Sequence, residues 1–83
     1  MTFNLLYYLD SQLEDYDRIL NDPTLSEHTR KNFEYLKAYV QWFKACNSDA
    51  SQSERKMLLD RKEELRRDAG RAMQEYIDSL SSP

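Results

Sequence analysis

The sequence is poor in the residues that make turns, with one glycine and two prolines among 83 residues. Sheet proteins need such residues between their many short strands, so the scarcity argues against a sheet. A single glycine also excludes the glycine-rich loops that hold phosphates in nucleotide-binding proteins. The sequence therefore favours an all-α protein without a phosphate-binding loop.

Cysteine and histidine are equally scarce, because Cys46 and His28 are the only ones. One cysteine cannot form a disulfide within the chain, and it fits a reducing compartment. Zinc sites draw mainly on cysteine and histidine, so we expect no metal and no other cofactor. The two residues lie 18 positions apart on one predicted helix, or about 27 Å, too far for a nucleophile and its base.

We therefore expect no enzyme, with His28 as an exposed side chain in the first turn of a helix and Cys46 as a small buried residue near a helix end. Long hydrophobic runs are missing too, since no stretch approaches the roughly 18 apolar residues of a membrane span. The first ten residues lack the basic segment of a signal peptide. We expect a cytoplasmic protein that does not enter a membrane.

The composition that remains is globular, with 40% apolar and 33% charged residues. We expect a single domain over residues 1–83. A chain of this size buries only about 60% of the surface that its unfolded form exposes, so its core is thin. Small domains often add a disulfide, a metal or a second subunit. With the first two excluded, self-association or a protein partner is the expected supplement.

Apolar periodicity predicts three helices, over about residues 3–20, 25–46 and 52–80. In the first helix, Thr2 is the predicted N-cap and Asn21 the predicted left-handed residue after the last turn. Its apolar stripe recurs at steps of three and four, through Leu6, Leu9, Leu13, Tyr16 and Leu20.

The starts of the other two helices carry capping-box patterns. Thr24 and Glu27 form a T-x-x-E pattern, with Ser26 as a rival cap two residues later, and Ser51 and Glu54 form an S-x-x-E pattern. Gly70 lies inside the third helix, where glycine costs about 1 kcal/mol relative to alanine unless it permits a close approach or a bend.

The second helix is apolar over about half of its circumference, which predicts a central position between two neighbours. One stripe holds Phe33, Leu36, Val40 and Phe43, and the other holds Tyr35, Tyr39, Trp42 and Cys46. Short connections favour antiparallel neighbours. We therefore predict an up-down-up antiparallel three-helix bundle whose third helix is longest and overhangs the others.

The face of the first helix opposite its leucine stripe combines aromatic and acidic side chains. Such a strip is suited to docking on a protein with a basic, partly apolar surface, because exposed aromatics are frequent binding anchors. The alternative is a solvated acidic face with stray aromatics near a terminus. The predicted partner-binding residues are Phe3, Tyr7, Asp10, Glu14 and Asp17.

A second surface is suited to self-association, through the aromatic stripe of the second helix and the overhang of the third. The alternative for the aromatic stripe is a place in the core of the chain. The predicted self-association residues are Tyr35, Tyr39, Trp42, Tyr76 and Ile77.

Charge is unevenly distributed along the chain, whose net charge is −3. Residues 1–29 hold six acidic side chains and one basic one, whereas residues 30–83 hold eleven basic and nine acidic ones. This asymmetry predicts attraction between the two halves, within one chain or between two. Acids are interleaved with the bases of the third helix, so binding of nucleic acid is not favoured.

Together these features predict a non-enzymatic protein-binding module, an inhibitor or adaptor that occludes a surface of its partner. Phage- or plasmid-encoded inhibitors fit this description by analogy, since they are often short, acidic and free of catalytic motifs. One alternative is a homodimeric structural or chaperone-type helical protein. A further and less favoured alternative is a nucleic-acid-binding regulator that uses the third helix.

Overall fold

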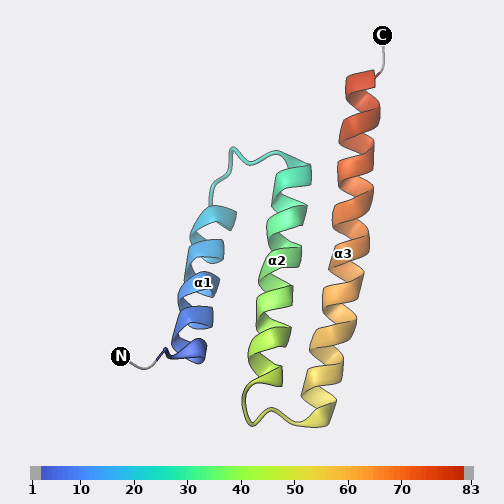
Figure 1. The fold of residues 1–83 in the computed structure, drawn as a ribbon. Helices are drawn as coiled ribbons and strands as arrows, with labels where there is room; N and C mark the ends of the chain where they lie inside the picture. The colour runs from blue at the N-terminus through green and yellow to red at the C-terminus, as the bar shows by residue number, and fades with distance from the viewer. Residues whose placement is uncertain (1–2, 82–83) are drawn as a thin grey trace.

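A computed structural model describes residues 3–81, and over these residues it contains three α-helices and no strand. They are α1 (Leu5–Leu20), α2 (Glu27–Cys46) and α3 (Gln52–Ser81), shown in Figure 1. The all-α prediction is confirmed. The third helix is the longest, with 30 residues against 16 and 20.

Two helices begin later than predicted. The Asn4 side chain caps α1, whereas Ser26, the rival cap predicted for α2, is its N-cap residue without a side-chain cap hydrogen bond. α1 begins at Leu5, since the Asn4 side chain accepts a hydrogen bond from the backbone N–H of Tyr7 at 3.1 Å. Thr2, the predicted cap, lies outside the described residues. α2 begins at Glu27 with Ser26 as its N-cap residue, so the start predicted at residue 25 was wrong.

The predicted cap Thr24 belongs instead to the turn between α1 and α2. Its N–H and hydroxyl both donate to the carboxylate of Asp22, at 2.9 and 2.6 Å. Arg30 donates to the carbonyl oxygens of Leu20 and Asp22 at 2.7 Å each, which satisfies acceptors left open at the end of α1. Asn21 stays in the right-handed region, with φ −78° and ψ −9°, so the left-handed conformation predicted there was wrong.

The start of α3 agrees with its sequence pattern. The Ser51 hydroxyl accepts a hydrogen bond from the backbone N–H of Glu54 at 3.1 Å. This contact satisfies one of the free N–H groups in the first turn of the helix. The predicted role of Ser51 as N-cap is confirmed.

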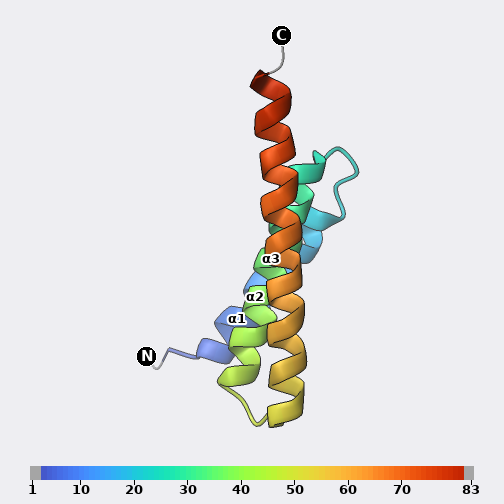
Figure 2. The ribbon, with the colours of Figure 1, turned by 90° about the vertical axis from the view of Figure 1, so that its right-hand side faces the viewer.

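The three helices lie side by side in one layer, with α2 in the middle and consecutive helices running in opposite directions (Figure 1). Turned by 90°, the layer is seen edge-on and the helices lie one behind the other (Figure 2). In the described part of the chain α2 packs against both neighbours, and α1 and α3 do not contact each other. The layer is therefore open, and a bundle closed around a shared core is not confirmed.

The dimensions of the chain agree with an open layer. Its radius of gyration is 15.2 Å, whereas a compact domain of this length has a radius of about 12 Å. The principal extents are 53 × 28 × 21 Å. Part of this elongation comes from the end of α3, which projects beyond α2 as predicted (Figure 1).

The core consists of small side chains. Within residues 3–81 no large side chain is fully buried, and the buried apolar residues are Leu9, Ala38, Val40, Ala45, Ala69 and Ala72. Alanine thus occupies the buried positions of both α2 and α3, which lets these two helices approach closely. Gly70 does not contribute to this approach, because a Cβ at its position would meet no atom within 4 Å.

Candidate protein interaction surfaces

Ion pairs join α1 to α2. The carboxylate of Asp17 lies 2.6 Å from the ammonium group of Lys37, and Asp10 pairs with Lys44 two helical turns further along. Beside them, the rings of Tyr16 and Phe33 pack with their centres 6.0 Å apart. The predicted attraction between the acidic and basic halves therefore operates within this chain.

These pairs divide the predicted docking strip of α1. Phe3 and Tyr7 are 71% and 74% exposed, and Glu14 is exposed with them. Asp10 and Asp17 turn toward α2, because they lie at the border of the strip where the long lysine side chains reach them. Phe3, Tyr7 and Glu14 therefore lie apart from α2, and we call these three residues the α1 edge. The two aspartates form contacts within the chain.

A buried cation joins α2 to α3. Lys62 is only 9% exposed, and its ammonium group lies 4.8 Å from the centre of the Trp42 ring and 5.2 Å from that of Tyr39. Both distances are within the range of a cation–π interaction. Tyr39 also contacts Tyr35, with ring centres 6.3 Å apart. Two of the predicted self-association residues, Tyr39 and Trp42, therefore hold α3 in place.

Glu63 balances the charge beside these rings. Lys62 donates to one of its carboxylate oxygens and Arg66 to the other, each at 3.0 Å. Two hydrogen bonds hold the pKa of Glu63 below its usual value of 4.5. The bond from Lys62 has the larger effect, and the bond from Arg66 has the smaller one. The cations on this side of α3 are therefore partly neutralised within the helix.

A ring stack joins the start of α2 to the upper part of α3. The rings of His28 and Tyr76 lie 3.8 Å apart at an angle of 19°. His28 is half-buried, so the expectation that it is exposed was wrong. Tyr76, expected to lie on an uncovered overhang, contacts α2 through this stack but remains 40% exposed, and Ile77 is 46% exposed.

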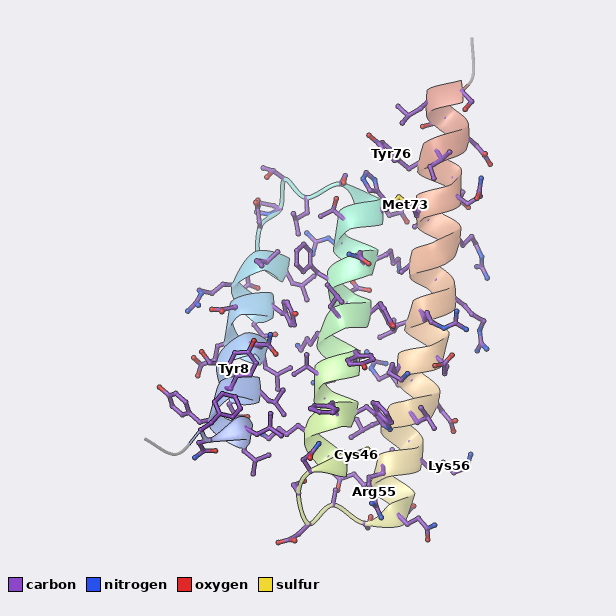
Figure 3. The ribbon with its side chains drawn as sticks, viewed as in Figure 1. Tyr8, Cys46, Arg55, Lys56, Met73 and Tyr76 are labelled. Carbon is purple, nitrogen blue, oxygen red and sulfur yellow. The ribbon has the colours of Figure 1, made fainter. Side chains whose placement is uncertain are left out.

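Cys46 is exposed, so its predicted burial was wrong as well. It is the last residue of α2 and lies next to the turn that leads to α3 (Figure 3). The buried position near this helix end is taken by Ala45. An exposed thiol at this place is open to oxidation between molecules.

One side of the layer carries exposed apolar side chains from all three helices. Between α1 and α2 a shallow hollow of about 250 Å³ is lined by residues that include Tyr8, Tyr39 and Phe43. Tyr39 contacts Lys62 of α3. At 100° per residue Leu59, Met73 and Ile77 lie within about 60° of Lys62, on the side that turns away from the buried alanines of α3. We call the exposed members the apolar face: Tyr8, Tyr39, Phe43, Leu59, Met73 and Ile77.

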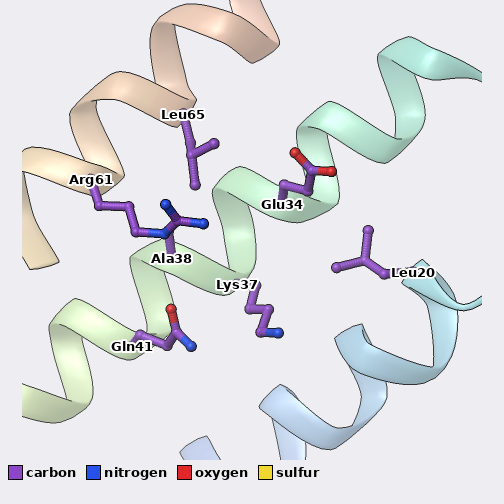
Figure 4. A pocket seen from close by; sticks show the side chains of 7 residues that line it. All are labelled: Leu20, Glu34, Lys37, Ala38, Gln41, Arg61 and Leu65. Atoms are coloured by element: carbon purple, nitrogen blue, oxygen red, sulfur yellow. The ribbon is translucent and has the colours of Figure 1, made fainter.

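The opposite side of the layer is polar. A hollow of about 330 Å³ there spans all three helices (Figure 4) and is lined by Leu20, Glu34, Lys37, Ala38, Gln41, Arg61 and Leu65. Further along, a second hollow is lined by Glu27, Lys31, Asp68, Arg71, Ala72 and Glu75. Charges of both signs alternate in these hollows, so the two sides of the layer differ in chemistry.

Nothing in the part of the chain that the structure covers resembles a metal site, because no three histidine, cysteine, aspartate or glutamate side chains gather there. None of the helices that the structure describes is both long enough and apolar enough to cross a membrane. The chain matches no protein-family model, no curated protein and no solved structure. The surfaces themselves are therefore the basis for a functional proposal.

Sequence reasoning missed four members of the apolar face, Tyr8, Phe43, Leu59 and Met73. Phe43 was assigned to the core stripe of α2, yet it remains 36% exposed. The signal that could have found the face is the width of the apolar stripe on α3. Leu59, Met73 and Ile77 lie beside the main stripe and exceed what one neighbouring helix can cover.

Proposed function

We propose that this chain is a non-enzymatic protein-binding module, an inhibitor or adaptor that covers a basic, partly apolar surface of another protein with its α1 edge. One observation carries the proposal. Phe3 and Tyr7 are the most exposed aromatic side chains among the described residues. Tyr7 and Glu14 lie on α1, whereas Phe3 precedes the helix and its N-cap residue Asn4. No other helix packs over them.

Aromatic side chains are effective anchors because they bring a large contact area with few rotatable bonds. The Phe3 ring is already positioned by its contact with Tyr8, with ring centres 5.8 Å apart. Tyr7 and Glu14 are separated by seven residues, which places them on the same side of the helix. A partner can therefore meet the Tyr7 ring and the Glu14 carboxylate with one surface, with Phe3 exposed just before the start of the helix.

The electrostatic part of this binding rests on Glu14. Asp10 and Asp17 are engaged with Lys44 and Lys37, and Asp15 pairs with Arg18 in the same helix. A single exposed carboxylate gives orientation and a modest increase in association rate, while most of the affinity comes from the aromatic anchors. Its reversal to lysine has a larger effect, because like charges that face each other across an interface cost several kcal/mol. Glu14 is also the acidic residue that can be replaced without breaking a contact between α1 and α2.

A photo-crosslinking experiment tests the proposal. The photoreactive residue p-benzoylphenylalanine replaces Tyr7 in one variant and Met57, an exposed residue of α3, in a control variant. Both are expressed in the native host and irradiated. We expect a discrete adduct with one basic protein from position 7, none from position 57, and loss of the adduct when Glu14→Lys is added.

The result that would overturn the proposal is the absence of such an adduct at position 7, or equal adducts at both positions. An adduct that survives Glu14→Lys would remove the basic surface from the proposal. Adducts with a second copy of the chain are recognised by their mass, so they are not mistaken for a partner.

The contacts of α3 give less support to nucleic-acid binding, the rival function for this helix. Lys62 and Arg66 share Glu63, and Lys56 pairs with Asp60. A surface that binds nucleic acid carries an uninterrupted positive patch, free of such neutralising acids. The pairing pattern therefore favours a protein partner.

A further inference from the structure

We propose that a second copy of this chain covers the apolar face, so that two layers stack face to face in a homodimer. The apolar face borders the α1 edge where Phe3 contacts Tyr8, but most of its residues belong to α2 and α3, and the inference does not depend on the function proposed above. It rests on the layer architecture, the exposed area and the balance of charge on the face.

The first argument is architectural. A helix that is apolar on one side must bury that side, and stable domains do so with at least two packed layers around one core. This chain supplies a single layer, because α1 and α3 lie on either side of α2 without contact in the described residues. Its buried residues are mostly alanines. A permanent second layer is therefore expected, and another copy is present wherever the chain is made.

The second argument is the area that needs cover. The accessible surface of the chain is 6226 Å², whereas a folded monomer of this mass exposes about 5,200 Å². The excess of roughly 1,000 Å² over the whole chain is of the same order as the ~800 Å² that each partner buries in a standard stable complex. Pairing of two chains would therefore bring the exposed surface of each to that of a compact monomer.

The third argument is the charge of the face. Lys62 and Arg66 lie on this side of α3, and Glu63 accepts hydrogen bonds from both. Arg55, one turn before Leu59, adds an exposed cation at the end of the face. Away from that end the charges of the face are paired, so apolar contact dominates, and a twofold axis can bring two such faces together.

The composition of the face agrees with this assignment. It contains two tyrosines, one phenylalanine and one methionine, which are residue types enriched in the cores of protein interfaces. Met73 lies on α3 beside the start of α2 (Figure 3), and Ile77 follows one turn later on the same helix. A facing layer would cover these two residues together with Tyr39 and Phe43.

Two methionines on α3 provide a matched test. Met73 belongs to the apolar face, and Met57 lies about 160° away around the same helix. Met73→Glu and Met57→Glu introduce the same charge at two exposed positions, which are 39% and 70% exposed. Both are made with Cys46→Ser, so that the exposed thiol cannot create a disulfide-linked dimer.

Size-exclusion chromatography with light scattering over a dilution series gives the dimer dissociation constant of each protein, and circular dichroism checks helix content. We expect a dimer for the Cys46→Ser parent and for Met57→Glu. For Met73→Glu we expect unchanged helix content and a dimer dissociation constant at least about 30-fold higher, since the charge would be buried at the interface. If Met73→Glu loses helix content, Ile77→Glu, beyond the His28–Tyr76 contact, replaces it. A monomeric parent, or equal effects at positions 57 and 73, would overturn the proposal.

Discussion

The ammonium group of Lys62 lies 4.8 Å from the centre of the Trp42 ring, so a nearly buried cation on α3 is held by an aromatic side chain on α2. Tyr39 contacts the same cation from α2 at 5.2 Å. The buried residues of α2 and α3 are mostly alanines, whose small side chains do not by themselves determine the register of two helices. The contact of Lys62 with Trp42 and Tyr39 explains how this register is held.

Replacement of Lys62 tests this contact. We expect Lys62→Ala to lower the free energy of unfolding by about 1–3 kcal/mol, because both the cation–π interaction and the packing of the lysine stem are lost. Urea unfolding measures the change. Lys56→Ala is the control, since the Lys56 side chain is 75% exposed, and it should change the free energy by less than about 0.5 kcal/mol. Equal effects at both positions would contradict the role of Lys62.

Acidification tests the hydrogen bonds of Glu63. Its pKa is lowered in the folded chain, so the bonds from Lys62 and Arg66 stabilise the fold above pH 4.5, and this stabilisation is lost as the pH falls through the lowered value. The unmodified protein should therefore lose more stability between neutral pH and about pH 3 than Glu63→Gln does. Urea unfolding across this range checks the difference. Parallel curves for the two proteins would contradict it.

Charge reversal tests the attachment of α1. Asp17→Lys places two ammonium groups together beside α2, so the amides of α1 should exchange with deuterium faster, and Lys37→Glu in the same molecule should restore protection. The effect should be modest, about 1 kcal/mol or less, and smaller at high salt. Glu14→Lys is the control, because Glu14 lies on the α1 edge. Rapid exchange that persists in the double variant would show that charge is not the cause.

Gly70 offers a stabilising substitution. Its position is helical and a Cβ there would meet no atom within 4 Å. Gly70→Ala should raise the free energy of unfolding by about 0.5–1 kcal/mol, since alanine loses less backbone freedom than glycine when the helix forms. Thermal unfolding at one fixed protein concentration measures the gain. A loss of stability would mean that another molecule approaches the backbone at this position.

The helices themselves could be predicted from local patterns, and their packing only in part. Spacing of apolar residues is a property of each segment, so α1, α2 and α3 were placed within about two residues of their observed ends. Ser51 was found because its bond to Glu54 is equally local. The start of α2 was missed because Thr24 bonds to Asp22 instead, and sequence spacing does not decide between these two partners.

The open layer could not be predicted, because periodicity shows which sides of a helix are apolar but not which neighbours meet. The aromatic stripe of α2 was expected to serve self-association, with a place in the core of the chain as the alternative. The buried contact positions are in fact Ala38 and Ala45, and Tyr39 remains partly exposed beside them. Asp10 and Asp17 were expected to face outward, and only the relative position of α2 shows that its lysines reach them.

Sedimentation equilibrium of the unmodified chain under reducing conditions, over a wide range of concentrations, tests the two-layer arrangement most directly. If a second copy covers the apolar face, the measured mass will approach twice the 10.0 kDa of the chain and fall toward the monomer value only on dilution. A mass that stays at 10.0 kDa at every concentration would contradict the homodimer.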